Sequence, residues 1–287
     1  MRFLLTLALL ATAGCSSTTG DDEEPTIATA FYPLAYVAEQ VAGGLAEVEN
    51  LTQPGAEPHD LSLSVGQTAT VARADLVIHQ AGFQPAVDET IEQNATGAVI
   101  DAAATVDLRR LPDGELDPHF WLDPLEMATL ADSVADRLAE LDPDNAGVYE
   151  SNAAELRGNL ESLDADYRRE LADCERRTVV VSHDAFGYLT RYDLEFAPVA
   201  GLSPDAEPTA TGLSQLQTLI RTEGITTVFT ERLASPRLTQ SLADDMGIGT
   251  AVLDPLEGLS PETSGEDYLS LMRQNLAALA KANGCRT

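Results

Sequence analysis

The longest helical pattern of the chain lies at residues 145–173, NAGVYESNAAELRGNLESLDADYRRELAD. Its apolar residues recur every three or four positions and place Tyr149, Leu156, Leu163 and Tyr167 on one stripe. At 1.5 Å per residue such a helix is ~40 Å long, about the length of the whole molecule. We therefore expect one long helix to join the parts of the fold that flank it.

On both sides of this helix, short apolar runs alternate with helical stretches. We expect strands at residues 26–29, 47–51, 75–79 and 98–101 before it, and at 178–182, 195–199, 227–230 and 250–253 after it. The expected helices span residues 33–43, 64–73, 86–93, 124–141, 185–192, 213–223, 235–246 and 268–283. Strict alternation indicates βαβ units and parallel sheets. The sequence thus predicts an α/β fold with two similar parallel-sheet lobes joined by one long rigid helix.

The first residues read as an export signal. The apolar stretch of residues 3–13 follows Arg2 and is shorter than the ~20 residues that cross a bilayer. Ala13-Gly14-Cys15 resembles a bacterial lipobox, although Thr12 stands where that pattern usually has Leu. We expect Cys15 to be acylated and to anchor the protein at the outer face of the bacterial membrane, with simple secretion as the alternative. The expected organisation is a signal peptide (1–14), a lipidated tether (15–25), an N-terminal lobe (26–123), a helical region (124–175) and a C-terminal lobe (176–287).

The composition is strongly acidic. Of the charged residues 47 are Asp or Glu and 17 are Lys or Arg, which gives a net charge of −30. Nucleic acid and anionic membrane surfaces repel such a surface, so neither is an expected partner. A negative field attracts cations, but solubility or a salty habitat explains the same acidity. The charge permits a metal-binding role and does not establish it.

Three of the four histidines have an aspartate within two positions, and two of these three directly follow a proline. The three segments are Pro58-His59-Asp60, then DPHFWLDP at residues 117–124 around His119, and SHDAFGY at residues 182–188 around His183. Neutral imidazole is the commonest metal ligand, and three imidazoles with a carboxylate suit zinc better than calcium or magnesium. His79 lacks such neighbours, and we expect it to line the wall of the site or to support a ligand.

Polar groups follow the ends of several predicted strands. His183, Glu231 and Asp254 come directly after the runs that end at residues 182, 230 and 253. In parallel α/β sheets, ligands bind beyond the carboxyl ends of the strands. We therefore expect groups from both lobes to face each other across a cleft that holds the metal. Asp60 could orient an imidazole by accepting its second ring N–H.

Signs of catalysis are few. Ser182-His183-Asp184 is no hydrolase triad, because adjacent residues on an extended chain point apart. The chain contains no GxSxG, HExxH or phosphate-binding loop. A zinc-dependent hydrolase remains an alternative, with Glu231 as its one plausible base, but nothing in the sequence supplies a substrate pocket. We expect a binding protein and no enzyme.

Cys174 and Cys285 remain once Cys15 is assigned to lipid. In an exported chain two cysteines predict a disulfide, which here would pin the last helix. Two buried free thiols are the alternative.

Four segments together resemble the metal-binding lipoproteins of zinc and manganese ABC importers, which are ZnuA-like and have the TroA-type fold. They are GxxPHD at residues 55–60, the histidine segments at 117–124 and 182–188, and LDPL at 253–256. The resemblance covers the mature chain in order and spacing. It implies His59, His119 and His183 as ligands, Asp254 as the carboxylate ligand, and Glu231 as a group behind a ligand.

The resemblance also implies a function. It predicts a monomer that captures Zn²⁺ and delivers it to the permease of a metal ABC importer, and some such lipoproteins also serve in cell adhesion. Manganese-type members carry Glu where this chain has His183, so we expect zinc, with Mn²⁺ or iron as the alternative. Zinc members often carry a His-rich loop before the second ligand, whereas residues 106–117 are short and contain no histidine.

Overall fold

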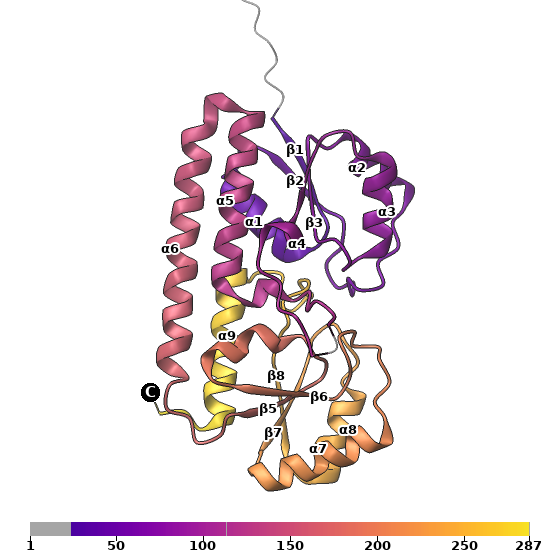
Figure 1. Ribbon diagram of the computed structural model, residues 1–287, viewed down its shortest axis with the longest axis vertical. Helices are drawn as coiled ribbons and strands as arrows, with labels where there is room; N and C mark the ends of the chain where they lie inside the picture. Colours follow the sequence, from indigo (N-terminus) through magenta and orange to yellow (C-terminus); the bar gives the residue numbers. More distant parts are fainter. Residues whose placement is uncertain (1–23, 113, 287) are drawn as a thin grey trace, which may run out of the picture.

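The computed structural model describes residues 24–112 and 114–286, which form two α/β lobes beside a pair of long helices (Figure 1). The predicted signal peptide, the acylated Cys15 and the tether up to residue 23 lie outside the described residues. Among the residues described, we find no helix with the length and apolar character needed to span a membrane.

The N-terminal lobe is built on a parallel sheet in the order β2-β1-β3-β4. Its strands are β1 (Thr26–Thr29), β2 (Glu47–Asn50), β3 (Leu76–His79) and β4 (Ala98–Asp101). Its helices are α1 (Tyr32–Ala42), α2 (Val65–Arg73), α3 (Pro85–Asn94) and α4 (Ala102–Thr105). Every residue of β3 is buried, as expected for a central parallel strand with both faces covered.

The C-terminal lobe repeats this plan with a parallel sheet in the order β6-β5-β7-β8. Its strands are β5 (Thr178–Val181), β6 (Glu195–Pro198), β7 (Thr227–Thr230) and β8 (Gly249–Val252). Its helices are the 3-10 helix η3 (Phe186–Tyr192), α7 (Ala210–Glu223), α8 (Arg237–Met246) and α9 (Tyr268–Asn283). The matching strand orders confirm the prediction of two similar lobes.

Two long helices lie side by side, and the longer one, α6, extends along both lobes (Figure 1). The 3-10 helix η1 (Phe120–Leu122) leads into α5 (Pro124–Leu141), and η2 (Pro143–Asn145) leads into α6 (Ala146–Glu170). The 25 residues of α6 correspond to ~37 Å. It packs on α5 and also contacts α1 of one lobe and α9 of the other. The predicted long connecting helix is thus confirmed.

The two lobes share one hydrophobic core that includes residues of both sheets and of α1, α5, α6 and α9. Trp121 links the lobes directly: its Nε1 donates to Pro255 O at 2.7 Å, and its carbonyl accepts from the Tyr268 hydroxyl at 2.5 Å. Tyr36 of α1 stacks on Tyr268 of α9 with ring centroids 5.3 Å apart. The segments that carry Trp121 in one lobe and Pro255 in the other are therefore held in a defined relative position.

The predicted disulfide is present between Cys174 and Cys285, which are 111 positions apart in the chain. It joins the chain just after α6 to the chain just after α9. The helix expected from 185 to 192 is present as the 3-10 helix η3. It ends at Asp193, whose φ of 62° is left-handed and stops the helix after two turns.

Candidate metal centre

Three histidines and one glutamate converge between the lobes. His59, His119, His183 and Glu257 each offer one ligand atom, and these atoms all lie within 4.8 Å of one another. The three predicted histidines are thus brought together. The carboxylate that joins them belongs to Glu257 and not to Asp254.

Each of the four side chains stands on a loop at the carboxyl end of a sheet. His59 follows β2, and His119 lies between α4 and η1, so both come from the N-terminal lobe. His183 lies two residues after β5, and Glu257 lies in the loop between β8 and α9. Each lobe therefore contributes two of the four groups, at the position where parallel α/β sheets bind ligands.

Three of the distances between ligand atoms are close to those of a tetrahedral zinc site. Glu257 Oε1 lies 3.3 Å from His59 Nε2, 3.5 Å from His119 Nε2 and 3.3 Å from His183 Nε2. In a tetrahedron with metal–ligand bonds of about 2.0–2.1 Å, neighbouring ligand atoms are about 3.3–3.4 Å apart. Two of these three distances therefore have the length expected around bound zinc, and the third, to His119 Nε2, is slightly longer.

Three of the four side chains of the site are almost completely buried. The side chains of His119 and His183 are 0% exposed and that of Glu257 is 2% exposed, while His59 retains 11%. Within the described part of the chain, the Nε2 atoms of His119 and His183 are buried without a hydrogen-bond partner. Buried ring nitrogens rarely stay unpaired. Their unsatisfied state fits a centre built to receive a cation.

Carboxylates behind the ring hold two of the imidazoles. His119 Nδ1 lies 2.8 Å from Asp117 Oδ1, and Asp117 is itself fully buried and paired with Arg109 at 3.2 Å. His183 Nδ1 lies 2.6 Å from Glu231 Oε1, which also accepts from the Ser182 hydroxyl. A proton held on Nδ1 by these carboxylates leaves the Nε2 lone pair free for a metal.

The same carboxylates control the charge of the site. Burial lowers the pKa of His183, but Glu231 and Glu257 outweigh burial and raise the pKa to about 10. Burial likewise opposes protonation of His119, whose pKa is nevertheless raised by Asp117 and Glu257. Burial raises the pKa of Glu257, yet its contacts with the histidines hold that pKa well below the usual value. Protons and a metal ion therefore compete for these imidazoles.

Asp254, the carboxylate expected from the resemblance, lies outside the group of four and makes other contacts. Its Oδ2 accepts from Arg232 Nε at 3.0 Å, and its Oδ1 accepts from Leu256 N at 2.9 Å. Leu256 has a left-handed φ of 57°, and the turn directs the next side chain, Glu257, to the histidines. One signal in the sequence could have shown this: Asp254-Pro255 repeats the Asp-Pro pattern of residues 123–124, where the aspartate also accepts a backbone N–H.

Of the other groups expected near the ligands, Glu231 contacts a ligand imidazole, whereas no described contact joins the side chain of Asp60 or His79 to one. Glu231 lies behind His183, where a supporting residue was expected. Asp60 is exposed, and no described contact joins its carboxylate to an imidazole; Glu57 Oε1 instead accepts from His59 N at 3.1 Å. His79 lies outside the group of four and is paired through Nδ1 with Asp88 at 2.9 Å.

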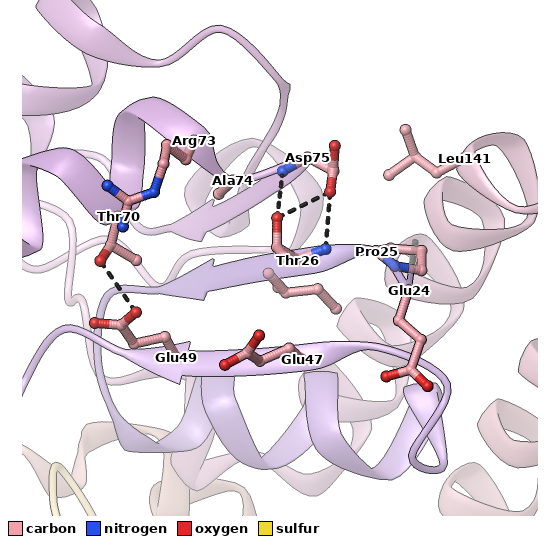
Figure 2. Close-up of a pocket in the computed structure, with 11 residues that line it drawn as sticks. Glu24, Pro25, Thr26, Glu47, Glu49, Thr70, Arg73, Ala74, Asp75 and Leu141 are labelled. Atoms are coloured by element: carbon pink, nitrogen blue, oxygen red, sulfur yellow. Dashed lines mark hydrogen bonds between the residues drawn. The ribbon is translucent and has the colours of Figure 1, made fainter. Parts of the chain in front are cut away.

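A large open cavity of about 720 Å³ lies elsewhere, where β1 and β2 begin (Figure 2). Figure 2 shows Thr26 donating to Asp75 through both its backbone N–H and its hydroxyl, and Thr70 donating to Glu49. None of the four converging residues lines this cavity. It sits at the amino ends of the strands, so it is separate from the metal centre.

The fold and the four converging side chains define a two-lobed metal-binding protein. The family described as "Zinc-uptake complex component A periplasmic" matches residues 27–282, and the chain belongs to this family.

Relatives of known name share about a third of their residues with this chain. The zinc-binding lipoprotein AdcA of Streptococcus pneumoniae is 33% identical over 299 residues, covering 96% of this chain and 59% of that protein. The high-affinity zinc uptake system protein ZnuA of Bacillus subtilis is 31% identical over 296 residues, covering 94% of this chain and 92% of that protein. The chain thus spans little more than half of the streptococcal relative and almost all of the Bacillus one.

Solved structures show the same fold. The Zn(II)-bound ZnuA-like domain of S. pneumoniae AdcA is 35% identical with a TM-score of 0.78, covering 91% of this chain and 99% of that one. The laminin-binding protein Lmb of Streptococcus agalactiae, described as having adhesin and metal-transporting activity, is 26% identical with a TM-score of 0.83, covering 90% and 99%.

Proposed function

We propose that this protein captures Zn²⁺ outside the cytoplasm and delivers it to the permease of an ABC importer. The observation that carries the proposal is the convergence of three Nε2 atoms on one carboxylate oxygen, which lies 3.3–3.5 Å from each; two of the nitrogens are buried and unpaired. The ligands we propose are His59, His119, His183 and Glu257. Zinc is here the cargo of the protein.

The ligand set favours zinc over manganese. Three imidazoles and one carboxylate suit a borderline-soft ion, whereas Mn²⁺ prefers carboxylate, carbonyl and water oxygens in octahedral sites. The charge also fits: Glu257 at the centre, with Asp117 and Glu231 behind two imidazoles, offsets the double positive charge in a buried site. Mn²⁺ or iron remains the alternative cargo.

The geometry favours capture over catalysis. A catalytic zinc keeps one position for water or substrate, while four protein ligands fill a tetrahedron. Glu231, the one base that a hydrolase could use, already accepts from His183 and Ser182. A hydrolase would have neither an open position nor a free base here.

The relatives' names support the transport role, since they are zinc-binding and zinc-uptake proteins. We propose that the mature protein acts as a monomer and is anchored through Cys15 at the outer face of the membrane. Each lobe supplies two ligands, so a permease that displaced a loop of one lobe would remove half of the coordination shell and release the ion.

A competitive titration tests this function. Metal-stripped protein is titrated with Zn²⁺ and Mn²⁺ against a chelating indicator. We expect one zinc per chain, bound at least about 100-fold more tightly than manganese. His119→Ala should weaken zinc binding strongly, whereas Asp60→Asn, which alters an exposed side chain next to His59, should leave it unchanged. Equal or tighter manganese binding, or an unaffected His119→Ala variant, would overturn the proposal.

A further inference from the structure

The two histidines that we propose as ligands from the N-terminal lobe share a local sequence. Both follow a proline, in Pro58-His59 and in Pro118-His119. A peptide bond is planar, so the proline carbonyl and the following histidine N–H and Cα lie in one plane. Whatever holds that carbonyl also limits the direction in which the imidazole leaves the backbone.

One loop holds both proline carbonyls. Gln80 Nε2 donates to Pro118 O at 2.8 Å, and Gln84 Nε2 donates to Pro58 O at 3.1 Å. The two glutamines are four residues apart in the loop between β3 and α3, and each is 2% exposed. Carbonyl oxygens only accept hydrogen bonds, so the amide groups must turn their NH₂ toward the prolines.

In making these contacts, each glutamine leaves its side-chain oxygen without a hydrogen bond from any described residue. The Oε1 atoms of Gln80 and Gln84 are buried without a hydrogen-bond partner in the described parts of the molecule. An apolar side chain at either position would avoid an unsatisfied buried oxygen. Polar groups that break this rule in a core are commonest where function requires them.

The loop is itself fixed at three points. Gly82 N donates to Asp88 Oδ2 at 2.8 Å, and Ala81 N donates to Asp101 Oδ1 at 3.0 Å. His79 Nδ1 lies 2.9 Å from the other oxygen of Asp88. These hydrogen bonds therefore hold the segment that carries the two glutamines, and they limit how far the amide donors can shift with the prolines.

The loop also contacts the imidazoles directly. The ring of Phe83, which stands between the glutamines in sequence, packs edge-on against His59 at 4.7 Å and lies 6.4 Å from His119. The same ring contacts Trp121 at 5.3 Å. One braced segment thus touches both ligand-bearing turns through their backbone and through their rings.

We propose that Gln80 and Gln84 are positioning residues that fix the N-terminal half of the metal centre before metal arrives. This inference rests on the proposed zinc-capture function and deepens it. Gln84 sets the turn of His59 and Gln80 sets the turn of His119, so the two imidazoles form a prearranged pair to which the C-terminal lobe adds His183 and Glu257.

Replacing each amide by an apolar side chain of similar length tests the proposal. Gln84→Met and Gln80→Met should each weaken zinc binding roughly 10- to 100-fold, the usual range for groups that orient a ligand. Gln67→Met is the matched control, because Gln67 Nε2 also donates to a backbone carbonyl, Leu51 O at 2.6 Å, in the same lobe. It should lower the melting temperature of the metal-free protein without changing zinc affinity.

Double variants separate positioning from general destabilisation. In a His59→Ala background the ligand that Gln84 orients is gone, so Gln84→Met should change zinc affinity by less than about twofold. In a His119→Ala background the same change should keep its full 10- to 100-fold effect. Gln80→Met should show the reverse pattern. If Gln84→Met does not fold, Gln84→Asn takes its place, because its shorter side chain cannot reach Pro58 O.

The outcomes distinguish this inference from the function on which it rests. Zinc binding by the unaltered protein that is lost in His119→Ala but equal in the three glutamine variants would overturn the positioning role alone. Equal effects of Gln84→Met in both histidine backgrounds would overturn it too. Failure of the unaltered protein to bind zinc would instead overturn the proposed function.

Discussion

The choice between Glu257 and Asp254 as the fourth ligand gives the sharpest prediction. Glu257 Oε1 lies within 3.5 Å of all three Nε2 atoms, whereas the Asp254 carboxylate is occupied by Arg232 and by the N–H of Leu256. Glu257→Gln and Asp254→Asn each remove one buried negative charge and keep the shape of the side chain. The pair therefore separates ligation from the general electrostatic field of the loop.

The magnitude follows from sharing the binding energy among the ligands. Zinc held by four protein ligands is bound by about 10–16 kcal/mol, or about 3 kcal/mol per ligand. At 1.4 kcal/mol per factor of ten, the loss of one ligand weakens binding about 100-fold. Asp254→Asn removes a partly exposed ion pair with Arg232 and should weaken zinc binding by less than about tenfold.

The assay is competitive titration of both variants with Zn²⁺, with the unfolding temperature of each metal-free variant measured as a control. A loss in Asp254→Asn that equals or exceeds the loss in Glu257→Gln would refute the assignment. It would show that the carboxylate predicted from the sequence resemblance, and not the one found among the histidines, binds the metal.

Three further predictions concern protons, support and cross-linking. The pKa of His183 lies above its ordinary value, at about 10, so zinc must displace a proton at neutral pH. As the pH is lowered, zinc affinity should therefore fall about tenfold per pH unit for each proton released. Titrations that give the same zinc affinity from pH 7.5 to pH 5 would contradict this. Glu231→Gln should lower zinc affinity roughly 10- to 100-fold, because it weakens the hydrogen bond that orients His183 through Nδ1. Asp60→Asn, which alters an exposed side chain, should leave zinc affinity unchanged. Equal losses in the two variants would argue against the role of Glu231. Replacing both Cys174 and Cys285 by Ser opens a loop of 111 positions and should lower the free energy of unfolding by up to about 4.7 kcal/mol in chemical denaturation. Zinc affinity should stay unchanged, because the disulfide lies beyond the ends of α6 and α9. A loss of zinc affinity in this variant would mean that the cross-link also holds the metal site in place.

Much of the fold could be predicted because its signals are local. The strands β1 and β4 begin and end where the apolar runs at 26–29 and 98–101 do, and α5 starts at the Asp123-Pro124 cap. The four-residue helix α4 was missed, since one turn is too short to show a helical period. The long helix was placed correctly but ends at Glu170, three residues earlier than its pattern suggested.

The histidines of the site could be predicted because loops after parallel strands meet at one edge of a sheet. Glu257 could not, because its direction depends on the left-handed backbone of Leu256 and on the hydrogen bonds of Asp254. Gln80 and Gln84 carried no signal either, since two glutamines in a short polar loop look like ordinary surface residues. Their role becomes visible only when the loops around them are folded.

The most direct test of the central claim is a crystal structure of the zinc-loaded protein with data collected at the zinc absorption edge. The account predicts one anomalous peak per chain, about 2.0–2.2 Å from the Nε2 atoms of His59, His119 and His183 and from a carboxylate oxygen of Glu257. A peak at another place, or a shell in which Asp254 or a water molecule replaces Glu257, would contradict it.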